Sequence, residues 1–480
     1  MRRCMVILCA FCGAWCCESI YAAPPDLTPQ QQWEIIVEDP RPMNEALIAL
    51  SEQLHVPITY EDPPFESSGD LKAVIPGTES FVPKGGRIHF VYRNTDGVDG
   101  AVAALLEQFN ANSTGGRFRH AGGGDIYNVI PSHYVNRSGE WVEFRSPLDT
   151  PVSLDAEERT CNDAVEAVFE AMSQVDDRFR FGAGHLHPNG PWNRIPYRPT
   201  GGEKTARDVL NTVTKLCNDA RSDKSYIYTW YFRVGPSAKD GDKPMCFFNL
   251  NRLSLRKPAP MALRVTSSRP MASVVRILEE RFGVTITYED PPYAGRDVMG
   301  TPGTEQCSFR GGIINLEWTY AQDSANGVLK QLMKTVISPR YNKDSFRMEM
   351  VDETHFHVRP VKMRNAEDVD VKYKSPWSEP LSQTLKGGPV HVVLERLCEQ
   401  VSATGKQPVV LAAIPEHLAA RLKKHTVADV AVDEDQSARD ALANILWAAD
   451  KTISWQVIYN LHTQRHELVL HDTKPEPSVQ

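Results

Sequence analysis

Several features that define enzymes and membrane proteins are absent from this sequence of 480 residues. It has no GxSxG, P-loop, GxGxxG or HExxH motif, which are the usual signatures of hydrolases, nucleotide-binding proteins and zinc peptidases. No stretch after residue 22 is long and apolar enough to span a bilayer. The formal charge of -8 argues against a general nucleic-acid-binding protein, because such proteins carry a basic surface. We therefore expect no nucleic-acid partner, no transmembrane segment in the mature chain, no cofactor, no metal site and no catalytic residue.

Cysteine is scarce outside the first seventeen residues. Five of the ten cysteines lie there, behind Met1-Arg2-Arg3, in a short uncharged run that is followed by Tyr21-Ala22-Ala23. A basic start, a short apolar run and small residues are typical of a secretory signal peptide, which we place at residues 1–22. Export to the periplasm or the extracellular space follows. A lipoprotein anchor is less favoured, because bulky residues precede Cys12 and Cys16.

The five remaining cysteines form no dense disulfide framework. They are odd in number and show no CxxC spacing. In an oxidising compartment a disulfide between Cys161 and Cys217 is the preferred pairing, because both lie in one predicted module. Buried free thiols are the alternative.

An internal repeat organises the rest of the chain. Residues 56–64 read VPITYEDPP and residues 284–292 read VTITYEDPP, so the two copies differ at one position. A second pair, TARDVL at 205–210 and SARDAL at 437–442, has a similar separation. In this pair Ser or Thr precedes Asp by three residues just before an apolar run, which predicts a helix start.

These repeats predict an α+β fold of four tandem small modules arranged as a duplicated pair. Each module is expected to pack two helices on one face of a small mixed sheet. The predicted boundaries are 33–135, 136–260, 261–362 and 363–474. Residues 23–32 and 475–480 are predicted to be a disordered linker and tail.

The pattern resembles the short N-terminal domain shared by secretins and TonB-dependent receptors. The matching stretches are Glu45–Leu50, Ile58–Asp62, Ala101–Leu106 and Tyr127–Ile130. The resemblance implies periplasmic contact with other proteins. Those families continue into a β-barrel, whereas residues 363–474 read as a fourth module, so we expect no pore.

Two acidic motifs are the sharpest polar features, and their role stays open. Tyr60, Glu61 and Asp62 in the first copy correspond to Tyr288, Glu289 and Asp290 in the second. A strand end followed by a Pro-Pro turn is favoured, because the residue before proline is held extended. Contact with a ligand or cation and acid–base catalysis are the alternatives.

Two histidine pairs are weaker candidates. His185 and His187, like His355 and His357, have the spacing of one strand face, which metals can use. No third ligand accompanies either pair, so exposed strand histidines are favoured.

The leading hypothesis is an exported, non-enzymatic repeat protein that binds cell-envelope proteins or peptides. Exposed sheet edges would supply the contact, since they accept a partner's strand through main-chain hydrogen bonds. The alternative is a ligand-binding protein or hydrolase with its site at the repeated motifs between modules. Assembly into an oligomer also remains open.

Overall fold

The computed structural model describes residues 32–473, apart from 74–80, 94, 114, 122–124, 185–190, 200–201, 236–242, 256–258, 295–296, 300–303, 305–306, 310, 335–344, 406 and 432–435. The predicted signal peptide and tail lie outside the described residues, as does the predicted linker except for Gln32. Within the described part, no helix has both the length and the apolar character needed to cross a membrane.

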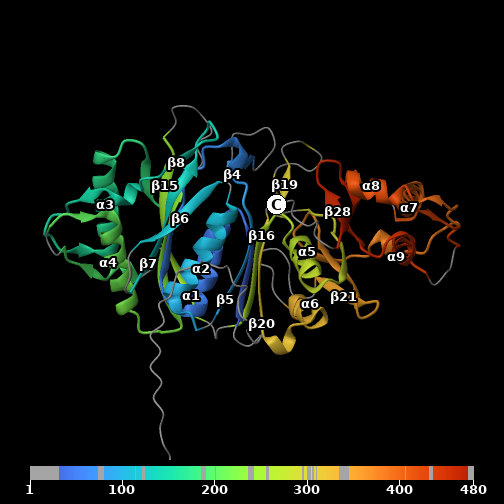
Figure 1. The fold of residues 1–480 in the computed structure, drawn as a ribbon, viewed down its shortest axis with the longest axis horizontal. Coiled ribbons are helices and arrows are strands. Elements are labelled where there is room, and N and C mark those ends of the chain that lie inside the picture. Colours follow the sequence, from blue (N-terminus) through green and yellow to red (C-terminus); the bar gives the residue numbers. More distant parts are fainter. Residues whose placement is uncertain are drawn as a thin grey trace, which may run out of the picture.

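The described chain is a mixed α+β structure, as the sequence predicts (Figure 1). Its α-helices are α1 (Pro42–Leu54), α2 (Gly97–Asn112), α3 (Cys161–Val175), α4 (Ala206–Asp219), α5 (Pro270–Phe282), α6 (Ala325–Lys334), α7 (Val390–Gly405), α8 (Glu416–Leu422) and α9 (Ala438–Ala449).

Reciprocal caps start three of these helices. At α4 the Thr205 hydroxyl accepts a hydrogen bond from the N–H of Asp208, and the Asp208 carboxylate accepts one from the N–H of Thr205. Ser437 and Asp440 make the same two bonds at α9, and α3 begins in the same way. Each cap satisfies main-chain donors that the first helical turn leaves unpaired. The predicted helix starts at 205 and 437 are therefore confirmed.

A central sheet joins the N-terminal half (residues 32–254) to the C-terminal half (residues 261–473). It runs in the order β20 (Gly312–Trp318), β16 (Met261–Ser267), β1 (Gln32–Asp39) and β5 (Gly86–Arg93). The two middle strands, β1 and β16, are parallel. Ile35 and Val37 of β1 enter the hydrophobic core around α1 and α2, whereas Ile36 enters the core around α5 and α6. The two helix pairs thus cover opposite faces of the central sheet (Figure 1).

Each half also has a longer sheet of its own. The N-terminal sheet runs in the order β11 (Arg180–Ala183), β15 (Met245–Ser254), β14 (Tyr226–Val234), β2 (Ile58–Glu61), β7 (Tyr127–Val135) and β6 (Gly116–Ala121), with β8 (Trp141–Glu143) also pairing with β7. The C-terminal sheet runs in the order β26 (Val409–Leu411), β29 (Arg465–Asp472), β28 (Ile453–Asn460), β17 (Thr285–Glu289), β22 (His355–Pro360) and β21 (Phe346–Met350). In the orders given, each pair of neighbouring strands in one sheet has the same relative direction, parallel or antiparallel, as the pair at the same position in the other sheet.

Short two-stranded ribbons complete the described structure. They are β3 (Leu71–Ala73) with β4 (Phe81–Pro83), β9 (Pro151–Val152) with β13 (Lys204–Thr205), β10 (Arg159–Thr160) with β12 (Pro196–Tyr197), β18 (Val298–Met299) with β19 (Ser308–Phe309), β23 (Lys362–Arg364) with β24 (Asp370–Lys372), and β25 (Gly388–Pro389) with β27 (Thr426–Val427).

The expectation that each module packs two helices on one face of a small mixed sheet is met in part. In the N-terminal half, α1 and α2 lie between the central sheet and the N-terminal sheet. Ile227 and Tyr231 of β14 pack into the core around α1 and α2, although they follow β2 by more than a hundred residues. Because strands of neighbouring segments join one sheet, main-chain groups that would lie at open edges form hydrogen bonds. The same arrangement buries both faces of the helix pair.

Candidate functional site

Glu61, in the first acidic motif, forms a buried ion pair with an arginine from the second repeated motif. Glu61 is the last residue of β2 and is 1% exposed. Arg207, in the first turn of α4, donates from Nε to Glu61 Oε1 at 2.7 Å. The same guanidinium contacts Asp149, and the Ser146 hydroxyl donates to Glu61 Oε2. The contact thus joins the end of β2 to the start of α4.

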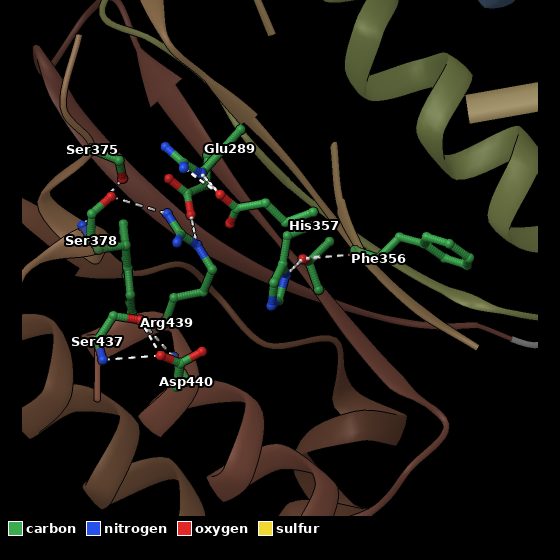
Figure 2. A network of polar contacts seen from close by, with 12 residues as sticks. Glu289, Phe356, His357, Ser375, Ser378, Ser437, Arg439 and Asp440 are labelled. Carbon is green, nitrogen blue, oxygen red and sulfur yellow. Dashed lines mark hydrogen bonds and ion pairs between the residues drawn. The ribbon is translucent and has the colours of Figure 1, made fainter. Parts of the chain in front are cut away.

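Glu289 repeats this arrangement in the C-terminal half. Arg439, in the first turn of α9, donates from Nε to Glu289 Oε1 at 2.5 Å and from Nη2 to the Ser378 hydroxyl at 3.4 Å. Figure 2 shows the Arg439 side chain reaching from α9 to Glu289, with Ser375 and Ser378 nearby. Burial disfavours the charged form of Glu289, but the charge and hydrogen bond of Arg439 outweigh burial and hold its pKa below the usual value.

The aspartates of the two motifs bind a different set of partners. Arg41 donates from Nε to Asp62 Oδ2 at 2.7 Å, and the N–H of Val234 donates to the same oxygen at 3.2 Å. Arg269 donates from Nε to Asp290 Oδ2 at 3.0 Å, and the N–H of Tyr459 donates at 3.0 Å. Each aspartate therefore ties the residue before α1 or α5 to a strand from later in the same half.

The tyrosines of the motifs belong to the hydrophobic core. Tyr60 and Tyr288 are buried, and their rings lie 5.6 Å from Phe118 and 5.8 Å from Phe346 respectively. The Tyr288 hydroxyl donates to Asp290 Oδ1 at 2.7 Å. Burial, together with the charge of Asp62, raises the pKa of Tyr60 well above its usual value.

This geometry determines what the motifs can do chemically. Glu61, Asp62, Glu289 and Asp290 are each at most 2% exposed, and each has an arginine partner. General acid–base catalysis needs a carboxyl group within reach of a substrate proton. Here the carboxylates face guanidinium groups inside the fold and hold segments of the chain together. Contact of the two motifs with a ligand remains a prediction. Because the carboxylates are buried, a ligand would bind to the surface beside them.

One participating motif escaped the sequence analysis. Ser146 and Ser375 each precede a proline that begins a short 3₁₀ turn, and Asp149 and Ser378 at the ends of these turns contact Arg207 and Arg439. The available signal was the similarity of RSPLDTPVS at 145–153 to KSPWSEPLS at 374–382, with nearly the separation of the other repeats.

The expectation of exposed strand histidines is wrong for His357, and His355 has one acidic neighbour. His355 contacts Asp352, while His357 is buried and contacts Thr287. His185 and His187 lie outside the described residues. Within the described ranges, no group of three or more His, Cys, Asp or Glu side chains could hold a metal ion.

His357 should make the stability of the protein fall in mildly acidic solution. Burial, followed by the charge of Arg439, lowers its pKa from 6.5 to about 4, while Glu289, Asp440 and Glu349 act in the opposite direction. The unfolded chain then binds a proton more readily than the native protein between these values. This contribution to stability is complete above pH 6.5 and is lost as the pH falls toward 4, by about 3 kcal/mol.

Urea unfolding at pH 7 and pH 4 measures this effect. His357→Gln keeps an amide near Thr287 and cannot titrate, so the variant should lose about 3 kcal/mol less than the parent between the two pH values. His462→Gln, at an exposed histidine, is the matched control and should leave the difference unchanged. Equal losses in the His357 variant and the parent would contradict the assignment.

Cys161 and Cys217 lie together in the core around α3 and α4. Both are buried free thiols, and a hydrogen bond links their side chains. This bond and burial raise the pKa of Cys217. The structure therefore brings the predicted disulfide partners into contact, and the disulfide itself stays a prediction.

No protein-family model and no curated protein matches this chain.

Proposed function

We propose that the chain is an exported, non-enzymatic repeat protein that binds extended segments of cell-envelope proteins or peptides. Four modules with the boundaries given above would form it, arranged as a duplicated pair and resembling secretin-type N-terminal domains. The supporting observation is a strand order that recurs four times: β2-β7-β6, β11-β15-β14, β17-β22-β21 and β26-β29-β28. In each set the first strand follows one helix, and the last two strands follow another.

The outer edges of these sheets are closed to different extents. At the edge strand β6, the Asn110 side chain accepts from the N–H of Phe118 at 2.8 Å and donates to its carbonyl at 2.7 Å. At the edge strand β26, the Ser402 hydroxyl accepts from the N–H of Val409 and donates to its carbonyl. Such side-chain caps occupy main-chain groups that would otherwise pair with another strand.

Farther along β26, no strand of the described residues pairs with the outer edge, and this observation carries the proposal. The N–H of Ala412 donates to Leu468 on β29, and the N–H of His466 donates to Pro408. The main-chain N–H and carbonyl groups of successive residues in a strand point to opposite sides. The carbonyl of Pro408 and the N–H of Ala412 point toward β29, so the N–H and carbonyl of Leu411 point to the open side. A groove of about 510 Å³ runs here between α7, β26 and α8.

The lining of this groove indicates its occupant. Val410, Leu411, Ala413 and other apolar side chains line it, together with two glutamates and two basic or titratable residues: Glu395, Glu399, His391 and Lys423. An extended segment with small or branched apolar side chains and a basic residue fits this surface. Its main chain would hydrogen bond to Leu411, and its basic side chain would face the glutamates.

Leu411→Pro tests the proposal, because proline removes the N–H on the open side. Photo-crosslinking from Ala413 in envelope extracts should recover a specific partner. Leu411→Pro should weaken binding of that partner at least about tenfold, the equivalent of one or two hydrogen bonds. The matched control Leu411→Ala keeps the N–H and should bind more tightly than the proline variant. Absence of a specific crosslink, or equal binding by both variants, would sink the proposal.

The alternative function, a ligand site or hydrolase centre at the acidic motifs, has weaker support. The four carboxylates are paired within the fold, so their replacement with alanine should lower thermal stability. Loss of a ligand or an activity from a variant that remains folded would favour the alternative instead.

A further inference from the structure

A groove in the N-terminal half lies beside the first acidic motif. Its volume is about 400 Å³, which is within the range of small-molecule sites. Its described lining comes from the residues before α1, the start of β5, the end of α2 and the start of β6. Aromatic side chains supply much of this lining: Tyr60, Phe65, Phe109 and Phe118. The site is separate from the groove along β26.

The C-terminal half offers an internal comparison. Gly85 and Gly311 occupy the same place before β5 and β20, and both have a positive φ, 79° and 76° respectively. Phe309 precedes Gly311 by two residues, whereas the corresponding residue before Gly85 is Pro83. The Phe309 ring lies 4.8 Å from the Tyr293 ring and 4.2 Å from Arg269 Cζ. Phe309 therefore occupies the space that the smaller proline leaves in the N-terminal half.

The arginines of the two halves also differ in their partners. Arg269 donates from Nη2 to the Tyr459 carbonyl at 2.8 Å, in addition to its bond with Asp290. Arg41 donates from Nε to Asp62, but its terminal nitrogens make no hydrogen bond to a described residue. Arg41 lines the groove, and its Cζ lies 5.7 Å from the centre of the Phe65 ring.

The charges around the groove favour an anion. Arg41, Lys84 and Arg87 line it together with one acidic residue, Asp70. Arg87 pairs with two glutamates and Arg41 pairs with Asp62. The terminal nitrogens of Arg41, which make no hydrogen bond to a described residue, are therefore the donors that an anion in this groove would meet. A guanidinium binds a carboxylate through two parallel hydrogen bonds, and the neighbouring rings favour an apolar body next to it.

We propose that this groove binds a carboxylate carried on an aromatic or branched apolar body, either a free organic acid or the C-terminal residue of a peptide. The carboxylate would meet Arg41, and the apolar body would lie among Tyr60, Phe65 and Phe118. The C-terminal half, where Phe309 stands in this place, would have no such site.

Calorimetric titration of the full chain with N-acetylphenylalanine tests the proposal. We expect one site per chain, and about tenfold weaker binding of N-acetylphenylalanine amide, which lacks the carboxylate. Arg41→Lys should weaken binding of the acid by about tenfold, because lysine cannot form the paired hydrogen bonds. Arg269→Lys is the matched control and should bind as the parent does. Equal binding of the acid and the amide, or an unaffected Arg41→Lys variant, would overturn the proposal.

Enlarging the residue at position 83 provides an independent check. Pro83→Phe should fill the groove and abolish binding of N-acetylphenylalanine. Thermal unfolding confirms that the variant folds, and if it does not, the comparison of the acid with the amide and the Arg41→Lys variant still decide. Unchanged binding in a folded Pro83→Phe variant would overturn the proposal.

A peptide arm separates the two sources of the carboxylate. Acetyl-Ala-Ala-Ala-Phe with a free carboxylate should bind at least as tightly as N-acetylphenylalanine if the natural ligand is a peptide C-terminus. Exclusion of the tetrapeptide, with the single residue still bound, would identify a free organic acid as the ligand class.

Discussion

Replacing Arg439 with alanine is expected to lower the free energy of unfolding by roughly 3–5 kcal/mol. The substitution leaves Glu289 buried without its cation, and the site has little room for water because Glu289 is 2% exposed. It also detaches the start of α9 from the end of β17. Chemical denaturation at pH 7 measures the loss directly.

Two further variants separate the ion pair from general damage to the fold. Arg439→Met combined with Glu289→Leu removes both charges and keeps apolar volume, so it should lose less than the single variant. Lys386→Ala is the matched control, since the Lys386–Asp429 pair is exposed and should contribute less than about 1 kcal/mol. A loss below about 1 kcal/mol in the Arg439 variant would show that the pair contributes little.

A disulfide between Cys161 and Cys217 is expected to raise the free energy of unfolding by roughly 4 kcal/mol. The bridge would close the long loop from the start of α3 to the end of α4 and restrict the unfolded chain. In a glutathione redox buffer, the two thiols would give two electrons and two protons to oxidised glutathione. The structure supports this pairing because the two side chains already touch in one core.

Peptide mapping without reduction identifies the bridge after refolding. The linked peptides should contain Cys161 and Cys217, while Cys246, Cys307 and Cys398 are alkylated only after unfolding, since they are buried. Cys161→Ala with Cys217→Ala should unfold at the same denaturant concentration with and without reductant. Full alkylation of Cys161 and Cys217 in the unfolded, oxidised protein would contradict the prediction.

Local signals in the sequence predicted the local structure well. The reciprocal caps at Thr205 and Ser437 depend on residues three apart, so their pattern is legible without the fold. The motifs at 60–62 and 288–290 end strands β2 and β17 at Glu61 and Glu289, as the following prolines indicate.

The long-range pairings were not predictable in the same way. Glu61 and Arg207 belong to two repeats that the sequence displays, yet nothing near either residue indicates that these repeats touch. The exchange of strands between neighbouring segments depends on which sheet edges meet, which is a property of the whole fold. Similarly, the sequence shows the difference between Pro83 and Phe309, two residues before Gly85 and Gly311, but it does not show that position 83 borders a groove.

The parallel contact of β1 with β16 holds the two halves together within a single chain. Two subunits encoded by one gene have identical sequences, so every substitution in one subunit appears in the other. A continuous chain fixes one of each half and lets them diverge, since each half carries its own substitutions. One half could thus close its groove with Phe309 while the other kept its groove open, an asymmetry that two identical subunits encoded by one gene could not acquire.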